Sequence, residues 1–269
     1  MTEKTKQDGI DWLKSVVHKH VGANIRRYKY KVMVNAPATA AFLGFQMDIS
    51  PVDGVVVEQS DDWLLVKSGR NDFFVGLKNM LSYIPENGSK VFIKPYARRR
   101  FDGKEIGAPE ENISDGIRSQ VFTLGDSSSR IPLDQKTLKS SYLKDMLNQL
   151  NVLPTGDGFR NIGNALVDAG GDHPALLGYQ DPDDKDCLDP RPSLEFSVNT
   201  EKFQGSLVIE YNRGIDYYDI VLKKDGVEQE RREDIDFTSV GPAIVDMVDD
   251  GKWRIAKVEI LKAAKKKAA

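Results

Sequence analysis

The chain has 269 residues, of which 40% are hydrophobic, and its formal net charge is -3 at pH 7. This length and apolar content are enough to bury a core, and typical domain sizes favour two domains over one. The chain has no run of about 18 apolar residues and no apolar segment near its charged start, so the sequence predicts neither a membrane span nor a secretory signal. Cys187 is the single cysteine, which excludes an internal disulfide or a cysteine-based zinc cage and fits a cytoplasmic protein.

Charge is distributed unevenly along the chain. Residues 1–110 contain 17 Lys and Arg against 13 Asp and Glu, whereas residues 111–269 contain 21 against 28. The basic part is therefore the candidate for binding polyanions, and the acidic part is the candidate for a protein partner.

The first elements in chain order are a helix and a basic strand. Apolar residues recur at helical spacing from Ile10 to Val21, with Asp8 as a possible cap and Gly22 as the end. The following segment, NIRRYKYKVMV, alternates basic residues with tyrosine and valine, which predicts a strand with one basic face.

Residues 53–104 contain four strand candidates: GVVVEQ, DWLLVKS, DFFVGL and SKVFIKPYARRR. Turn residues separate them at intervals typical of a small barrel. Pro95 lies within the last candidate and favours an edge position or a bulge there, because proline lacks the amide proton of the ladder. We therefore predict that residues 1–106 form a helix and a small antiparallel β-barrel.

The second part of the chain contains a helical connector, an acidic stretch and a strand-rich region. Residues 107–180 are predicted to be a connector with two helices, one ending before Pro154 and one from Phe159 to Ala169. The acidic, proline-rich stretch YQDPDDKDCLDPRP follows, and we place a domain boundary there. Residues 193–262 alternate as strands around one short helix near residues 238–248, so the whole chain is predicted to be α+β.

The stretch KPYARRRFDGK, residues 94–104, is the strongest candidate site. It sets basic side chains beside aromatic rings, the combination that holds phosphates and stacked bases in single-strand binding grooves. The alternative is a solvated hairpin tip, with Asp102-Gly103 as the turn and the aromatic residues in the core. With the basic strand at 26–31, the sequence predicts a nucleic-acid-binding face made of Arg27, Lys29, Lys94, Tyr96, Arg98, Arg99, Arg100 and Phe101.

The order of motifs in residues 54–104 resembles the KfrB-type domain of plasmid-encoded proteins. The residues that carry the resemblance are Gly54, Val66, Gly69, Arg70, Ile84, Pro85, Gly88, Val91, Ile93, Tyr96, Asp102 and Gly103. It implies an accessory protein of a plasmid or other mobile element that handles DNA and is not an enzyme. This chain departs from the pattern at residues 97–100, inserted before the closing turn, so the resemblance implies nothing about those arginines or about residues 110–269.

The remaining motifs predict no cofactor, metal or catalytic site. The acidic run from Asp181 fails the EF-hand pattern at its fifth, sixth and twelfth positions, and TGDGFRNIGNAL lacks the glycine or lysine of a phosphate-binding loop. His18 and His20 point to different faces of a helix, and neither His173 nor the serines at 127–129 have a recognisable catalytic context.

Three functional hypotheses follow. The first is a cytoplasmic, non-enzymatic protein that binds single-stranded or duplex nucleic acid through its N-terminal half. The second is a protein-interaction or regulatory module whose basic face meets an acidic protein. The third is an enzyme of an unrecognised class.

Overall fold

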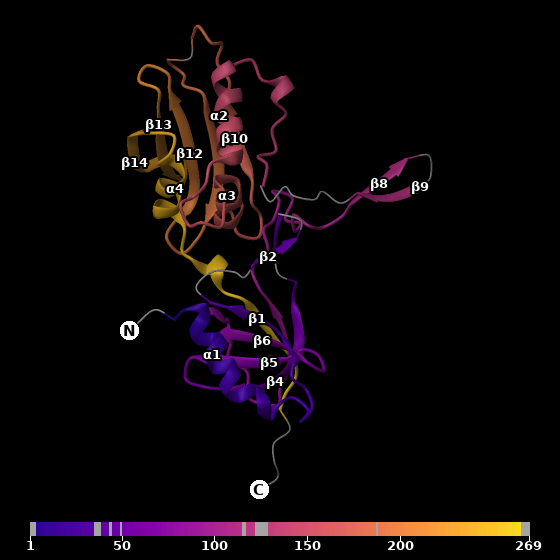
Figure 1. The fold of residues 1–269 in the computed structure, drawn as a ribbon. Helices are drawn as coiled ribbons and strands as arrows, with labels where there is room; N and C mark the ends of the chain where they lie inside the picture. The colour runs from indigo at the N-terminus through magenta and orange to yellow at the C-terminus, as the bar shows by residue number, and fades with distance from the viewer. Residues whose placement is uncertain are drawn as a thin grey trace. The chain divides into compact units, whose positions relative to one another are not determined.

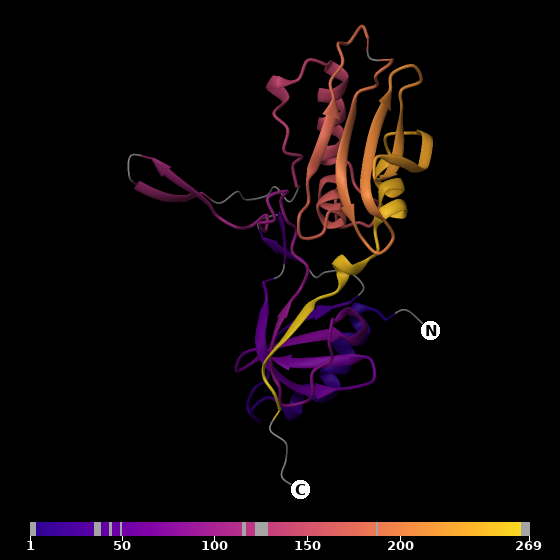
Figure 2. The same cartoon turned by 180° about the vertical axis from the view of Figure 1, so that it is seen from behind.

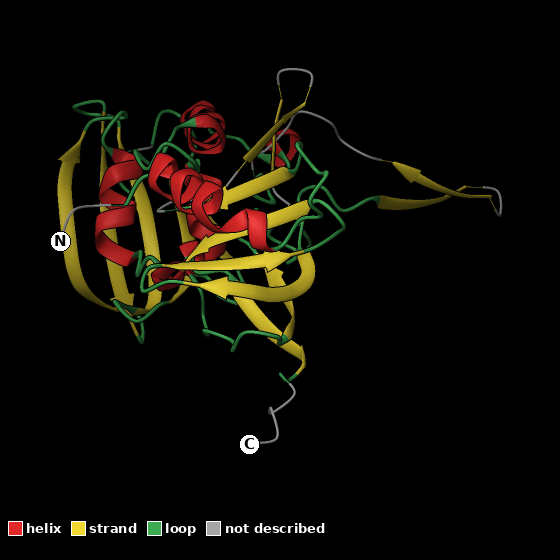
Figure 3. Cartoon of the chain, turned by 60° about the horizontal axis from the view of Figure 1, so that its bottom comes forward, coloured by secondary structure: helices red, strands yellow, loops and turns green. Residues whose placement is uncertain are grey.

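The computed structural model of the protein describes residues 4–34, 39–42, 45–48, 50–114, 117–121, 129–186 and 188–264. The chain divides into two compact units, one made of Met1–Ala97 with Gly251–Ala269 and the other of Arg98–Asp250. Both contain helices and strands, so the predicted α+β class is confirmed (Figure 3). No helix in the described ranges has the length and apolar character needed to cross a membrane. Cys187 and the lysines at 265–267 lie outside the described residues.

The first unit begins with helix α1, Lys6–Val16, which continues into a short 3-10 helix at Val17–Lys19. Its cap is Thr5, whose hydroxyl accepts the Asp8 amide proton while the Asp8 carboxylate accepts the Thr5 amide proton. This reciprocal capping box starts the helix earlier than the predicted Ile10, because the signal lies in the Thr5–Asp8 pair and not in Asp8 alone.

Six strands form the sheet of the first unit, in the order β1-β6-β5-β4-β7-β15. β1 is parallel to β6, and every other neighbouring pair is antiparallel. The strands are β1 Lys29–Met33, β4 Val52–Gln59, β5 Trp63–Lys67, β6 Asp72–Leu77, β7 Lys90–Lys94 and β15 Lys257–Lys262. The strands expected between residues 26 and 100 are thus present, but among the described strands the sheet stays open, with β1 and β15 as its edges, and no closed barrel forms. Strands β2 (Thr39–Phe42) and β3 (Phe45–Asp48) pair as a separate two-stranded sheet.

Strand β15 is the element that returns the C-terminal segment to the first unit. It pairs with β7, and the Ala256 amide donates to the Met80 carbonyl just before the strand begins (Figure 2). Ala256 is fully buried in the same core as Leu65, Phe74 and Ile93. The sequence predicted this strand but assigned it to the C-terminal domain, because alternation identifies a strand and not its neighbour in a sheet.

The second unit is a five-stranded antiparallel sheet in the order β10-β11-β12-β13-β14, with three helices against it. The strands are β10 Leu176–Gln180, β11 Ser193–Asn199, β12 Gln204–Asn212, β13 Tyr217–Lys224 and β14 Val227–Ile235. The helices are α2 Ser141–Val152, α3 Ile162–Ala169 and α4 Val240–Val248. They pack against β12, β11 and β13 respectively (Figure 1). The apolar side chains of alternate strand positions fill the space between.

The core of the second unit is continuous across the predicted boundary at 181–192. Leu143 and Leu150 of α2 belong to the same buried cluster as Phe196 and Ile209 of the sheet. Asp181 accepts hydrogen bonds from the amides of residues 139 and 140, which ties the acidic stretch to the start of α2. The structure therefore divides the chain at residues 97–98 and 250–251 and not near residue 185. Polar, proline-rich composition marks a loop but does not show whether the elements on either side share a core.

One two-stranded ribbon of the second unit is exposed along its whole length. It consists of β8 (Glu110–Ser114) and β9 (Ile117–Val121), and every side chain of both strands is exposed. Sequence alternation predicts a single strand here, from Gln120 to Leu124, of which residues 122–124 lie outside the described ranges.

We expect a fragment of residues 98–250 to unfold cooperatively in urea, because it contains every residue of the larger core. A fragment of residues 193–262 is the control. It lacks α2 and α3, so its sheet would expose Leu194, Phe196 and Ile209, and we expect no cooperative transition. Circular dichroism during urea titration checks both. If only the shorter fragment unfolded cooperatively, the division at residues 97–98 and 250–251 would be contradicted.

Candidate functional site

The stretch 94–104 crosses the division between the two units. Lys94 and Tyr96 belong to the first unit, whereas Arg98, Arg99, Arg100 and Phe101 belong to the second. Lys94 ends β7 and is exposed, and the Tyr96 ring packs edge-on against Trp253 with 5.0 Å between ring centroids. The eight residues predicted as one binding face therefore belong to two separate units.

The three consecutive arginines are engaged within the second unit. Arg98 is only 3% exposed, and its guanidinium lies over the Phe159 ring at 5.0 Å from the centroid. Arg99 donates to the Gly171 carbonyl at 3.1 Å and lies 3.9 Å from the Asp168 carboxylate. Arg100 pairs with Glu110 at 2.7 Å. The predicted solvated position of these arginines is thus wrong, although phosphate contact by them stays a prediction.

The predicted turn at Asp102-Gly103 is present. The Arg100 amide donates to the Lys104 carbonyl, and the Gly103 amide donates to the Arg100 carbonyl. Gly103 has a φ of 80°, which suits glycine because it has no Cβ. Phe101, beside the turn, packs against the main core with its ring 6.1 Å from that of Phe196. The residues flanking the turn are anchored by packing and ion pairs, which turn chemistry alone does not reveal.

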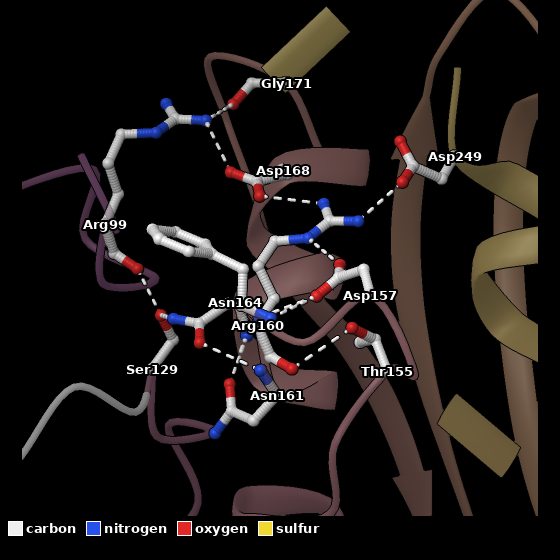
Figure 4. Close-up of polar contacts among 11 residues, drawn as sticks. Arg99, Ser129, Thr155, Asp157, Arg160, Asn161, Asn164, Asp168, Gly171 and Asp249 are labelled. Carbon is white, nitrogen blue, oxygen red and sulfur yellow. Dashed lines mark hydrogen bonds and ion pairs between the residues drawn. The ribbon is translucent and has the colours of Figure 1, made fainter. Parts of the chain in front are cut away.

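A cluster of buried charged side chains surrounds Arg160 and is drawn in Figure 4. The Arg160 side chain is 1% exposed and contacts three carboxylates: Asp157 at 2.8 Å, Asp168 at 3.0 Å and Asp249 at 2.5 Å. Burial alone would lower the pKa of Arg160, but the three carboxylates outweigh it and raise that pKa above its ordinary value. The guanidinium stays charged because each of its edges faces an acid.

Asp157 is the carboxylate that fixes the loop before α3. It accepts hydrogen bonds from the amides of Phe159 and Arg160, both at 2.8 Å, besides the guanidinium. Burial would raise its pKa, but these hydrogen bonds to the ionised form hold the pKa below its usual range. The charged form of Asp157 is therefore the one that the folded loop requires.

The segment TGDGFRNIG is shaped by its own side chains. Asn161 caps α3 by accepting the Asn164 amide proton, and the Asn164 side chain in turn accepts from the Asn161 amide. The Asn164 side-chain amide also donates to the Ser129 hydroxyl, which donates to the Arg99 carbonyl (Figure 4). The N-terminus of α3 is thus capped by side chains of the same segment.

The acidic stretch at 181–186 also has structural partners. Asp184 accepts from the Ser141 amide at 2.8 Å and from the Ser140 hydroxyl at 3.1 Å, at the start of α2. In the described ranges no three His, Cys, Asp or Glu side chains gather as a metal site. His20 lies beside Glu58 at 3.2 Å between ring nitrogen and carboxylate, in contact with one acid only.

A different basic surface is exposed on the first unit, along the edge strand β1. We call it the β1 edge: Arg26, Arg27, Lys29, Tyr30 and Lys31. All five are exposed, and its four cations make no ion pair with any described residue. Of this set, sequence reasoning had selected Arg27 and Lys29. The others were visible in the same alternation, RRYKYK, that predicted the strand.

Two aromatic rings lie next to the β1 edge: Tyr28, just before the strand, and the buried Phe73 of β6. Tyr28 packs against Tyr30 with 6.0 Å between centroids and meets Phe73 of β6 edge-on at 6.1 Å. Lys67 lies 6.0 Å above the Phe73 ring. One acid, Asp72, is paired in register with Lys29 and partly offsets the local charge. The β1 edge therefore combines four cations with Tyr30, which is 42% exposed.

The charge difference is larger between the two structural units than between the two parts of the sequence. The first unit carries 20 Lys and Arg against 11 Asp and Glu, a formal charge of +9, whereas the second carries 18 against 30, or -12. The asymmetry between the two parts of the sequence was smaller because residues 251–269, with 7 Lys and Arg against 1 Glu, belong to the basic unit. The two units therefore suit oppositely charged partners.

No family model, curated protein or solved structure matches this chain. The resemblance of residues 54–104 to KfrB-type domains therefore stays a prediction.

We expect Arg160→Ala to lower the free energy of unfolding by about 3–5 kcal/mol, because it leaves three enclosed carboxylates without their cation. Arg160→Lys should be nearly as damaging, because an ammonium lacks the forked geometry that reaches three acids. Urea unfolding measures both. Arg118→Ala, at an exposed position of β9, is the control and should change stability by less than about 0.5 kcal/mol. Equal losses in the Arg160→Ala variant and the control would contradict this role.

Stability should also fall in acid through Asp157. Its folded pKa lies below the unfolded value, so its contribution is complete above the unfolded pKa of about 4 and is lost as pH falls through the folded pKa. Arg160 stays protonated throughout this range and adds no pH dependence. Thermal midpoints measured between about pH 6 and pH 2 should therefore decline less steeply in Asp157→Asn than in the wild type. Parallel curves would show that other carboxylates control acid unfolding.

Proposed function

We propose that the protein is a non-enzymatic nucleic-acid-binding protein and that the β1 edge of its first unit is the binding surface. The observation that carries the proposal is a set of four cations, on and just before an edge strand, that make no ion pair with described residues in a unit with a charge of +9. Cations without intramolecular partners can release counterions from a phosphate backbone at no cost in broken ion pairs.

The geometry of the strand supports a polyanion as the ligand. Lys29 and Lys31 occupy alternate positions of β1, so their side chains leave the same side of the strand about 7 Å apart, and Arg26 and Arg27 come just before the strand. Several cations along one segment suit a repeating chain of phosphates better than they suit one small anion. Tyr30 lies on the other side of the strand, is exposed and can offer a ring face to a base.

The proposal moves the predicted interface toward Arg27 and Lys29 and away from Arg98, Arg99 and Arg100. The latter are held by Phe159, Asp168 and Glu110, so contact with phosphate would first have to break those interactions. They also belong to the unit with a charge of -12, whose field repels a polyanion. The link to plasmid or mobile-element biology depends only on the sequence resemblance and is proposed on that basis.

Fluorescence anisotropy of the full chain with labelled single-stranded and duplex oligonucleotides tests the proposal. Lys29→Gln combined with Lys31→Gln should flatten the slope of log affinity against log salt by about 1.4 on a single strand, or about 1.8 on a duplex. Lys257→Gln combined with Lys262→Gln is the matched control, since it removes the same charge from exposed positions on the opposite edge of the same sheet.

The control pair should leave the slope within error of the wild type. Equal flattening by both pairs would mean that net charge, and not the β1 edge, controls binding. A wild-type protein that binds neither oligonucleotide at low salt would refute the proposed function.

A further inference from the structure

The second unit has a sheet face that no described helix covers. Helices α2, α3 and α4 pack on one side of the sheet, and in Figure 2 strands β11 to β13 lie in front of α2 and α3. Because side chains alternate along a strand, this second side carries the residues between the core positions. Among them are Ser193, Glu195, Val208, Glu210, Asp219 and Lys223.

A groove of about 750 Å³ crosses this face. It is lined by residues of all five strands, from Gly178 of β10 to Glu233 of β14, and the loop Leu188–Arg191 forms part of its wall. A groove that spans a whole sheet is long enough to hold an extended chain of several residues.

The floor of the groove is held in place by a buried acid. Asp219 is 2% exposed and accepts from the Arg191 guanidinium at 2.5 Å and from the Asp234 amide at 3.1 Å. Arg231 is paired with Glu210 at 2.9 Å and with Glu228 at 2.8 Å. Both arginines of the groove are therefore already neutralised by carboxylates of the same sheet and do not favour an anionic ligand.

Unlike the two arginines, most acids of the groove have no partner of opposite charge among the described residues. Asp189 and Glu233 make no ion pair with described residues, and Glu195 accepts a hydrogen bond from Ser206, which carries no charge. The unit as a whole has a charge of -12. Lys223 also lines the groove and offsets part of this charge, so three acids without an ion pair face one such cation among the described residues. The charge of the groove therefore favours a cationic occupant.

Exposed apolar side chains lie at the β10 end of the same groove. Leu188 is 62% exposed and lies beside Pro190 in the lining. Aliphatic groups at a groove can anchor an apolar side chain of a protein, whereas a simple polyamine has no apolar side chain to place there.

We propose that this groove docks an extended, lysine- or arginine-rich segment of a partner protein, with one apolar side chain against Leu188 and Pro190. The acids Asp189, Glu195 and Glu233 supply charge complementarity, and the apolar end selects a peptide over a bare polycation. The surface belongs to the second unit alone, so this partner is independent of the nucleic acid proposed for the first.

Anisotropy of a fluorescein-labelled, lysine-rich peptide with one central leucine tests this on the full-length protein. Glu195→Gln combined with Glu233→Gln should weaken binding about tenfold, the upper range for two exposed ion pairs. Leu188→Ser should weaken binding of the leucine peptide about fivefold and should leave binding of a peptide with serine in place of leucine unchanged. The matched control, Asp145→Asn combined with Asp172→Asn, removes the same charge at exposed sites outside the groove and should alter binding less than about twofold.

Thermal midpoints equal to that of the wild type show that the variants are folded. Equal weakening by the groove and control pairs would overturn the proposal in favour of diffuse attraction to an acidic unit. Competition by spermine as effective as that by the leucine peptide would overturn the peptide as occupant. Concentration-dependent self-association that the groove variants abolish would identify a second copy of this chain as the occupant and likewise overturn it.

Discussion

The second unit depends on the charge balance around Arg160. One guanidinium joins the loop before α3 through Asp157, the end of α3 through Asp168 and the end of the unit through Asp249. Arg99, at the start of the unit, contacts the Asp168 carboxylate as well. The cluster therefore connects the points where the chain enters and leaves this unit. An enclosed set of charges is stable only when complete, so it fixes both ends of the unit together.

The need to fix the start of the second unit explains the positions of Arg98, Arg99 and Arg100 in the stretch 94–104. The chain enters the second unit at Arg98, so the side chains there are needed to anchor the entry. Arg98 lies over Phe159, next to Arg160, and the Arg99 carbonyl accepts from Ser129. A run of arginines beside aromatic rings has the same composition whether it faces phosphate or its own protein. Only the surrounding partners distinguish the two cases.

Segregation of charge between the units is the second organising feature. The first unit exposes unpaired cations at a sheet edge, and the second exposes acids on an uncovered sheet face. A polyanion and a basic protein segment would each be attracted to one unit and repelled by the other. A near-neutral chain of this kind can bind two partners of opposite charge, a possibility that the total of -3 conceals.

The sequence by itself determined the local elements. Alternation predicted β1, β4 to β7 and β11 to β15, helical spacing predicted α1 to α4, and Asp102-Gly103 predicted its turn, because each pattern reflects contacts between near neighbours in the chain. The basic face at Arg27 and Lys29 was predictable for the same reason. Tertiary structure alone decided that β15 joins β7, that α2 and α3 share a core with the sheet beyond residue 185, and that Arg98, Arg99 and Arg100 are engaged. Those outcomes depend on residues distant in sequence, such as Asp168, Phe196 and Ala256, whose proximity no local period encodes.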